Sequence, residues 1–327
     1  MSKTLALPAR LYHVARMMSA FAGRPVAGWS PRPPLPAAPA VQGVKLGGGI
    51  TLWRLPVGVM RIRERHRALP DKLAQVEDAL RFPVMMSDSR ITGWLDCTAW
   101  LIDHPERRIL VDTGEAEDFG TPAYFGVAAG MGRMYPKIID ATAAPGNDLA
   151  SMIAATGVRP QDIELCVLTH THSDHIGNLA ALAPATRLLV SPEELVPAPR
   201  SGRLLAKLPQ DGRLVQTARQ GADPVLGASM PLTTRGDVRV IAMPGHTGGH
   251  QAVVIDLGAR RIILAGDAAF DDDQVARGVI PGIVEDSLAT RATYDTLRRA
   301  AQEKPTLALF THDPANGGKL AAFAPPA

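Results

Sequence analysis

The residues best suited to chemistry in this 327-residue sequence lie in one short stretch, 168–178, which reads LTHTHSDHIGN. It places three histidines and an aspartate within six positions: His170, His172, Asp174 and His175. Imidazole and carboxylate groups are the ligands that zinc and similar ions take in catalytic sites. A polar surface loop is the alternative interpretation, but three of the nine histidines of the chain fall within these six residues. The spacing therefore predicts a metal-binding loop.

Three later apolar runs, each with the length of a buried strand, also end in a residue that can bind a metal: His246, Asp267 and His312. Polar residues that follow strands at one edge of an α/β sheet converge on a crevice where ligands bind. The glycines in the segment 244–250, PGHTGGH, allow the backbone to turn sharply and to approach closely. We therefore expect four separate segments to build one site.

The elements that must position these residues follow from the apolar runs and their flanking polar residues. The predicted strands are 50–62, 91–102, 108–111, 163–168, 187–190, 238–243, 261–265 and 306–310. The predicted helices are 71–81, 148–156, 179–183 and 287–301, and a helix start is expected at 191–194. Residues 115–147 form a long connection with aromatic and methionine side chains, which either lines a substrate pocket or packs on the core or on a partner subunit.

Composition excludes several classes of protein. The formal net charge is only +3, and no stripe of lysine and arginine interleaved with aromatic residues indicates nucleic-acid binding. The two cysteines, Cys97 and Cys166, lie in apolar runs and are expected to be buried free thiols rather than parts of a disulfide scaffold. No run of eighteen apolar residues is present, so no membrane span is predicted.

The first 48 residues differ from the remainder. No acidic residue occurs before Glu64, and residues 25–40 are rich in proline and alanine. We expect 1–48 to be a basic, Pro/Ala-rich arm and 49–327 to be one catalytic domain. A cytoplasmic location is predicted; export is the alternative if residues 1–23 act as a targeting segment, but the apolar part of that segment is short for this role.

The ordered motifs THTHSDH, PGHTGGH, GDAAF and THD resemble the metallo-β-lactamase superfamily, from about Ile50 to the end of the chain. The resemblance implies an α/β fold, a four-layer αβ/βα sandwich with the metal site at one edge between two sheets. It implies two divalent ions per chain, expected to be zinc, with iron, cobalt or manganese as alternatives. The implied ligands are His170, His172 and His246 for one ion, Asp174, His175 and His312 for the other, and Asp267 for both.

The same resemblance implies the chemistry. A hydroxide that bridges the two ions would attack the substrate, because metal binding lowers the pKa of water to roughly 7. Asp174 and Asp267 are the predicted catalytic carboxylates, and Asp174 would pass a proton to the leaving alkoxide. His250 and Asp112 are expected to support the ligands without binding metal themselves.

Within the superfamily the sequence is most similar to N-acyl-homoserine lactonases, the quorum-quenching enzymes. The turn Asp112-Thr113-Gly114, the serine in the histidine loop and the last segment PTLALFTHD carry this similarity. One position departs from the pattern, because Phe270 stands where these lactonases usually have a tyrosine that reaches the substrate carbonyl. Tyr124 or Tyr135 would then replace the missing hydroxyl, or the metals suffice, or the substrate differs.

The predicted function is therefore the metal-dependent opening of a lactone ring. The alternatives are an aryl-ester or organophosphate hydrolase and a glyoxalase II-like thioesterase, although the fifteen residues after His312 leave little room for the C-terminal helical domain of glyoxalase II. The partner is a small-molecule lactone or ester, and a homodimer is left open. The expected substrate contacts are Phe119, Tyr124, Phe125, Met131, Met134, Tyr135 and Phe270.

Overall fold

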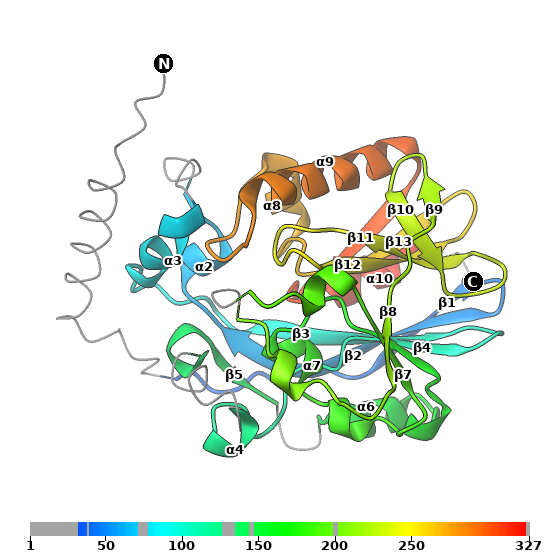
Figure 1. The fold of residues 1–327 in the computed structure, drawn as a ribbon, viewed down its shortest axis with the longest axis horizontal. Coiled ribbons are helices and arrows are strands. Elements are labelled where there is room, and N and C mark those ends of the chain that lie inside the picture. Colours follow the sequence, from blue (N-terminus) through cyan, green and yellow to red (C-terminus); the bar gives the residue numbers. More distant parts are fainter. Residues whose placement is uncertain are drawn as a thin grey trace.

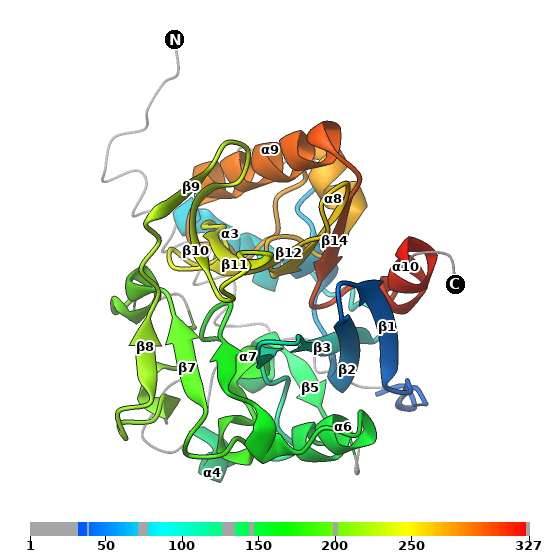
Figure 2. The same cartoon turned by 90° about the vertical axis from the view of Figure 1, so that its right-hand side faces the viewer.

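Two β-sheets face each other in the computed structural model, and helices cover their outer sides (Figure 1). Figure 2 shows these four layers edge-on, with α9 above one sheet and α6 below the other. The structure describes residues 32–37, 39–70, 78–125, 135–143, 147–198 and 202–324. This is the predicted four-layer αβ/βα arrangement, and the fold class is confirmed.

The first sheet runs in the order β1-β2-β3-β4-β6-β7-β8, and β5 pairs with β2. Its strands are β1 (Gln42–Gly47), β2 (Ile50–Arg61), β3 (Leu95–Asp103), β4 (Arg108–Val111), β5 (Asp140–Thr142), β6 (Leu165–Val167), β7 (Arg187–Val190) and β8 (Leu214–Gln216). The neighbours β4, β6, β7 and β8 are parallel. Their carboxyl ends therefore lie at one edge of the sheet.

The second sheet runs in the order β14-β13-β12-β11-β10-β9. Its strands are β9 (Gly221–Asp223), β10 (Gly227–Pro231), β11 (Val238–Ala242), β12 (Gln251–Asp256), β13 (Arg261–Gly266) and β14 (Thr306–Phe310). β13 and β14 are parallel, and β12 is antiparallel to both β11 and β13. The strands β11, β13 and β14 thus point the same way and end at a common edge.

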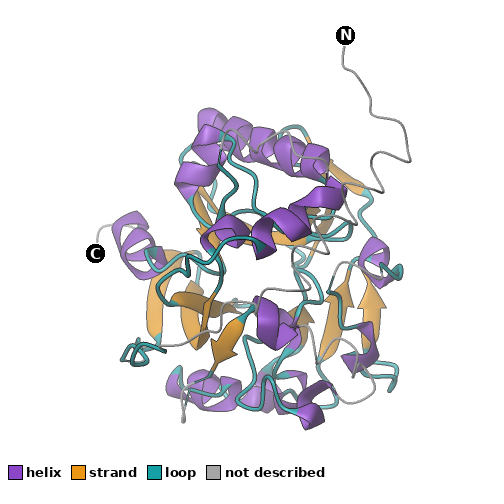
Figure 3. Cartoon of the chain, turned by 90° about the vertical axis from the view of Figure 1, so that its left-hand side faces the viewer, coloured by secondary structure: helices purple, strands orange, loops and turns teal. Residues whose placement is uncertain are grey.

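The outer layers are formed by short helices around one sheet and by a long helix on the other, and Figure 3 shows them on the outer sides of the strands. The α-helices are α2 (Glu64–Arg67), α3 (Asp78–Met86), α4 (Pro122–Phe125), α6 (Leu149–Ala155), α7 (Ser173–Ile176), α8 (Asp272–Arg277), α9 (Ser287–Glu303) and α10 (Asn316–Phe323). Single 3₁₀ turns are η3 (Pro160–Asp162), η4 (Leu179–Ala181), η5 (Pro192–Leu195) and η6 (Leu205–Lys207). No helix in the described ranges is long and apolar enough to cross a bilayer.

Alternation along the strands builds the core. In β13, Ile262 and Leu264 face the first sheet, whereas Ile263 and Ala265 face α9, and all four are fully buried. A side-chain period of two with both faces apolar is what a strand covered on both sides requires. The inter-sheet layer therefore fixes how the two sheets lie on each other.

Most predicted elements are confirmed, and β4, β7 and β14 have the predicted bounds. Asp148 caps α6 by accepting a hydrogen bond from the backbone N–H of Ser151. The predicted helix 179–183 is only the single turn η4, and the predicted helix 71–81 appears as α3, which continues to Met86; residues 71–77 lie outside the described ranges.

Several elements were not predicted, among them β1, β5, β8, β9, β10, β12, α2, α4, α7, α8 and α10. β1 lies inside the segment expected to be an arm, yet it pairs with β2 throughout its length. Residues 1–23, for which a targeting role is the alternative to an arm, lie outside the described residues. The buried cysteines Cys97 and Cys166 are free thiols, as predicted.

The inter-sheet layer yields a prediction for stability. Leu264→Ala removes a fully buried side chain from this layer and should lower the free energy of unfolding by roughly 2–5 kcal/mol, because it leaves a cavity. Leu288→Ala, at a position on α9 that is 77% exposed, should change it by less than about 0.5 kcal/mol. Urea unfolding of both variants checks this; equal losses would contradict the assignment of Leu264 to the core.

Candidate metal centre

The predicted ligands meet at the edge where the strands of both sheets end. The ligand atoms of His170, His172 and His246 form one group, and those of Asp174, His175, Asp267 and His312 form a second. Within each group the atoms lie within 4.8 Å of one another; six of the seven residues are buried, and His172 is partly buried. The four expected segments therefore do converge.

In the first group three imidazole nitrogens face one point. Nδ1 of His172 lies 3.0 Å from Nε2 of His170 and 3.0 Å from Nε2 of His246. His170 and His172 follow β6 in the first sheet, whereas His246 follows β11 in the second. Three nitrogens in this arrangement match the donor set of a catalytic zinc site, which leaves a further position open.

In the second group two carboxylates lie between two imidazoles. Nε2 of His312 is 3.1 Å from Oδ2 of Asp174 and 3.2 Å from Oδ2 of Asp267. Nε2 of His175 is 3.3 Å from Oδ1 of Asp267. The Oδ2 atom of Asp267 also lies 3.5 Å from Nε2 of His246, a member of the first group. Asp267, a member of the second group, thus also lies beside the first.

Two buried atoms of this cluster fit a bound cation. Nε2 of His175 and Oδ1 of Asp267 make no hydrogen bond in the described part of the chain, although they lie close together. Nδ1 of His175 is 2.8 Å from Oδ2 of Asp112 and donates to it, so Nε2 carries a lone pair whenever the ring is neutral. A lone pair that faces a carboxylate in a buried site is unfavourable unless a proton or a metal ion lies between them.

The directions of the pKa shifts also indicate that this site favours a positive charge. Burial opposes protonation of His175, but the carboxylates of Asp267, Asp112 and Asp174 outweigh it and raise its pKa well above the usual value. Burial alone would raise the pKa of Asp174, yet His175 and His312 lower it to about 2. Asp174 is therefore ionised, and the imidazoles of His175 and His312 partly compensate its negative charge. A divalent cation would supply this charge directly.

The side chain of Asp112 holds the histidine loop in place. Its carboxylate accepts hydrogen bonds from the backbone N–H of Thr169 at 2.7 Å, from the Thr169 hydroxyl at 2.8 Å and from His175. Asp112 has φ of 62°, the only positive value of a non-glycine residue among those described. Such backbone strain persists where surrounding contacts compensate for it. This position matches the predicted supporting role of Asp112.

His250 also lies next to the ligands without joining either group. Its Nδ1 donates to the carbonyl oxygen of Met243 at 2.9 Å, and its Nε2 accepts from the backbone N–H of Asp267 at 3.0 Å. His312 is oriented in the same way, because its Nδ1 lies close to the carbonyl oxygen of Asp96. Both nitrogens of His250 are thus fixed by the backbone, whereas in His312 the fixed Nδ1 determines where Nε2 points.

Glu194 is a supporting residue that sequence reasoning missed. This fully buried carboxylate accepts hydrogen bonds from the backbone N–H and the hydroxyl of Thr171, at 3.0 and 2.8 Å, and from the hydroxyl of Thr247 at 2.6 Å. Thr171 lies between His170 and His172. Glu194 therefore links the ligand loop of the first sheet to that of the second.

A glycine makes this link possible. A Cβ atom at Gly249 would lie 2.0 Å from the backbone nitrogen of Glu194, so only glycine fits there. The buried Arg203 guanidinium continues the link: it lies 3.6 Å from Glu194 and pairs with Glu285, which accepts from the backbone N–H of Gly248. In the sequence, Glu194 is one of two acidic residues at a helix start, and nothing in that pattern separates it from its exposed neighbour Glu193.

Three of the residues expected to contact substrate, Phe119, Tyr124 and Tyr135, form an aromatic cluster. The ring of Phe119 packs edge-on against Tyr124 and Tyr135, with centroids 5.6 and 6.3 Å apart. Their hydroxyls donate to the carbonyl oxygens of Ser173 and Gly202. Met131, Met134 and the side chain of Phe125 lie outside the described residues. Both tyrosine hydroxyls are therefore committed to backbone partners.

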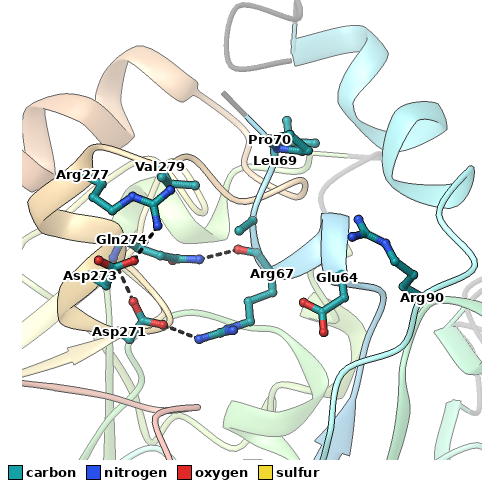
Figure 4. A pocket seen from close by; sticks show the side chains of 11 residues that line it. Glu64, Arg67, Leu69, Pro70, Arg90, Asp271, Asp273, Gln274, Arg277 and Val279 are labelled. Carbon is teal, nitrogen blue, oxygen red and sulfur yellow. Dashed lines mark hydrogen bonds and ion pairs between the residues drawn. The ribbon is translucent and has the colours of Figure 1, made fainter. Parts of the chain in front are cut away.

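Phe270 lies beside His312, a member of the second ligand group. Its ring centroid is 5.6 Å from that of His312, and the side chain is buried in a small cluster with Met60, Ile62 and Cys97. A separate cavity of about 430 Å³ lies between α2 and α8 (Figure 4). None of the seven ligand residues lines this cavity. The predicted ligands therefore lie apart from that cavity.

Comparisons with known proteins agree with this site. The metallo-beta-lactamase superfamily model matches residues 92–312, which include all seven predicted ligand residues. This chain belongs to that superfamily. The relatives that it matches include proteins named as a probable metallo-hydrolase and as N-acyl homoserine lactonases.

Two curated relatives illustrate the similarity. A probable metallo-hydrolase of Mycobacterium tuberculosis, Rv2300c, is 32% identical over 57% of this chain and 59% of its own length. The match thus spans less than two thirds of that relative. The N-acyl homoserine lactonase AttM of Agrobacterium fabrum is 25% identical over 66% of this chain and 81% of its own length.

A solved structure supports the fold. It is an N-acyl homoserine lactone hydrolase with the product N-hexanoyl-L-homoserine at its catalytic metal centre. Its TM-score is 0.60, with 17% identity over 85% of this chain and 96% of its own. At this identity the likeness concerns the fold alone.

The position of Glu194 yields a prediction for metal retention. Glu194→Gln removes the charge that holds Thr171 and Thr247, so we expect metal affinity to fall about 10- to 100-fold. The matched control is Glu193→Gln, whose side chain is 56% exposed. Bound metal measured against increasing chelator compares the two. If both variants retain metal like the unaltered protein, Glu194 does not position the ligands.

Proposed function

We propose that this protein binds two divalent metal ions and opens a lactone ring, with zinc as the expected metal and an acyl-homoserine lactone-like substrate. The observation that carries the proposal is the pair of buried ligand groups joined by Asp267. His170, His172 and His246 would hold one ion, and Asp174, His175 and His312 the other. The lactonase relatives, and the fold they share with this chain, support the lactone substrate.

When bound, the ions would lower the pKa of a shared water to roughly 7 and polarise the substrate carbonyl. The chain itself orients the participants. Asp112 holds His175 in one tautomer, and His250 holds the backbone of Asp267. Asp174 lies within 3.1 Å of His312 and can hold a proton that it returns to the leaving alkoxide.

A second candidate function rests on one observation. Phe270 lies against the second ligand group, and a phenyl ring donates no hydrogen bond to a substrate carbonyl. Hydrolysis of an aryl ester or an aryl phosphotriester needs no such donor from this position. A glutathione thioester is the remaining alternative. The three aromatic residues Phe119, Tyr124 and Tyr135 would border the acyl group in the lactonase case.

Hydrolysis of a small panel separates these functions. The panel contains long-chain and short-chain acyl-homoserine lactones, a simple γ-lactone, an aryl ester, an aryl phosphotriester and a glutathione thioester. Hydrolysis of each substrate is measured by pH-stat with added zinc, cobalt or manganese. We expect the acyl lactones to be preferred, with rates that depend on chain length. Activity confined to the aryl ester or the phosphotriester would refute the lactone substrate and leave the metal site intact.

Removal of the shared ligand tests the metal site itself. Asp267→Asn should lower turnover by at least about 100-fold and reduce bound metal per chain, because the buried carboxylate that touches both groups is lost. Asp273→Asn makes the same change at a side chain that is 67% exposed and should leave both quantities unchanged. Metal analysis and thermal melting accompany the rates. Full activity of Asp267→Asn would remove this residue from the site.

A further inference from the structure

His66 is a buried histidine near the metal centre that none of the preceding roles uses. It lies on the short helix α2 and is only 6% exposed. Its ring packs edge-on against Phe270, with centroids 6.3 Å apart, and Phe270 in turn packs on His312. The Nδ1 atom of His66 has no hydrogen-bond partner in the described ranges. A buried polar atom without a partner is costly, so its persistence calls for a functional explanation.

Residues of both ligand groups influence the pKa of His66. Burial is the main reason why its pKa falls to about 3, and the charges of His312, His172, Asp267 and Asp174 also act on it. His172 belongs to the first ligand group, and the other three belong to the second. At neutral pH the ring is therefore uncharged, with one N–H that donates and one lone pair.

The helix that carries His66 is fixed by bonds to the segment around Phe270. The side-chain amide of Gln274 accepts from the backbone N–H of Phe270 at 2.9 Å and donates to the carbonyl oxygen of Arg67 at 2.6 Å. Figure 4 shows Gln274 and Asp271 on one side of the cavity reaching toward Arg67 on the other. The two rings are thus held at a set distance.

A second set of backbone contacts holds α2 from the other direction. The backbone N–H of Gly282 donates to the carbonyl oxygen of His66 at 2.9 Å, and that of Leu69 donates to Ile280 at 3.1 Å. A Cβ atom at Gly282 would lie 2.1 Å from the carbonyl oxygen of Arg65, so glycine permits this close approach. Donors aligned before the substrate binds need no reorganisation during reaction.

We propose that His66 is a substrate-binding residue whose imidazole N–H donates to an oxygen of the substrate's acyl group at the metal centre. This inference rests on the proposed function, since it requires that a carbonyl or a carboxylate binds there. Phe270 cannot donate, and the hydroxyls of Tyr124 and Tyr135 already donate to backbone carbonyls. His66 thus supplies the polar contact that these three side chains do not.

The test replaces His66 in the metal-loaded protein. His66→Phe keeps a ring against Phe270 but removes the donor, and it should lower kcat about 100- to 1000-fold on whichever panel substrate the unaltered protein hydrolyses best. His66→Gln retains an N–H and should recover part of the loss. Metal content and melting temperature should stay unchanged in both. His104→Phe, at a buried histidine that pairs with Asp237, is the control and should keep its activity.

A binding measurement requires no turnover. The visible spectrum of the cobalt-loaded protein is titrated with acetate, and His66→Phe should bind it about 10-fold more weakly. Full activity and unchanged acetate binding in His66→Phe would overturn the proposal, as would a loss that only follows loss of metal. Failure of every lactone in the panel would refute the proposed substrate instead, and His66 would then be tested with the active ester and with acetate.

Discussion

The burial of several carboxylates and imidazoles in one small volume is the constraint on which this structure depends. Asp174 and Asp267 are at most 9% exposed, and each lies within hydrogen-bonding distance of a histidine. Burial of a charge is unfavourable unless a partner compensates for it. The fold must therefore hold these groups in place even though they gain little from packing. Asp112, Glu194 and His250 perform this task, and each is itself buried and hydrogen-bonded.

The sheets determine where the ligands can come from. In the first sheet the predicted ligands all follow β6, whereas in the second they follow β11, β13 and β14, which point the same way and whose carboxyl ends share an edge. The first sheet provides His170, His172, Asp174 and His175, and the second provides His246, Asp267 and His312. Because inward- and outward-facing apolar residues alternate along β13, the packing of the two sheets brings these edges together.

The fold class could be predicted from the sequence, and so could the residues that meet at the sheet edge, because they lie in four segments that each follow an apolar run with the length of a strand. Other features depend on contacts between distant segments. β1 has the sequence QGVKLG, which carries little strand signal, and it forms by pairing with β2. His66 lies in the charged segment ERHR, which indicates a surface helix; only the docking of α2 against residues 280–282 buries it. Glu194 likewise gains its role from Thr247, 53 positions away.

The division of the ligands between the sheets links metal binding to the folding of the whole domain. An ion held by His172 and His246, or by His175 and Asp267, would connect residues of opposite sheets. A ligand that binds only the folded state stabilises it according to its concentration and affinity. The same ion would therefore act as a reversible cross-link between two halves of one chain, and the supply of metal in the surroundings would set the mechanical cohesion of the domain as well as its chemistry.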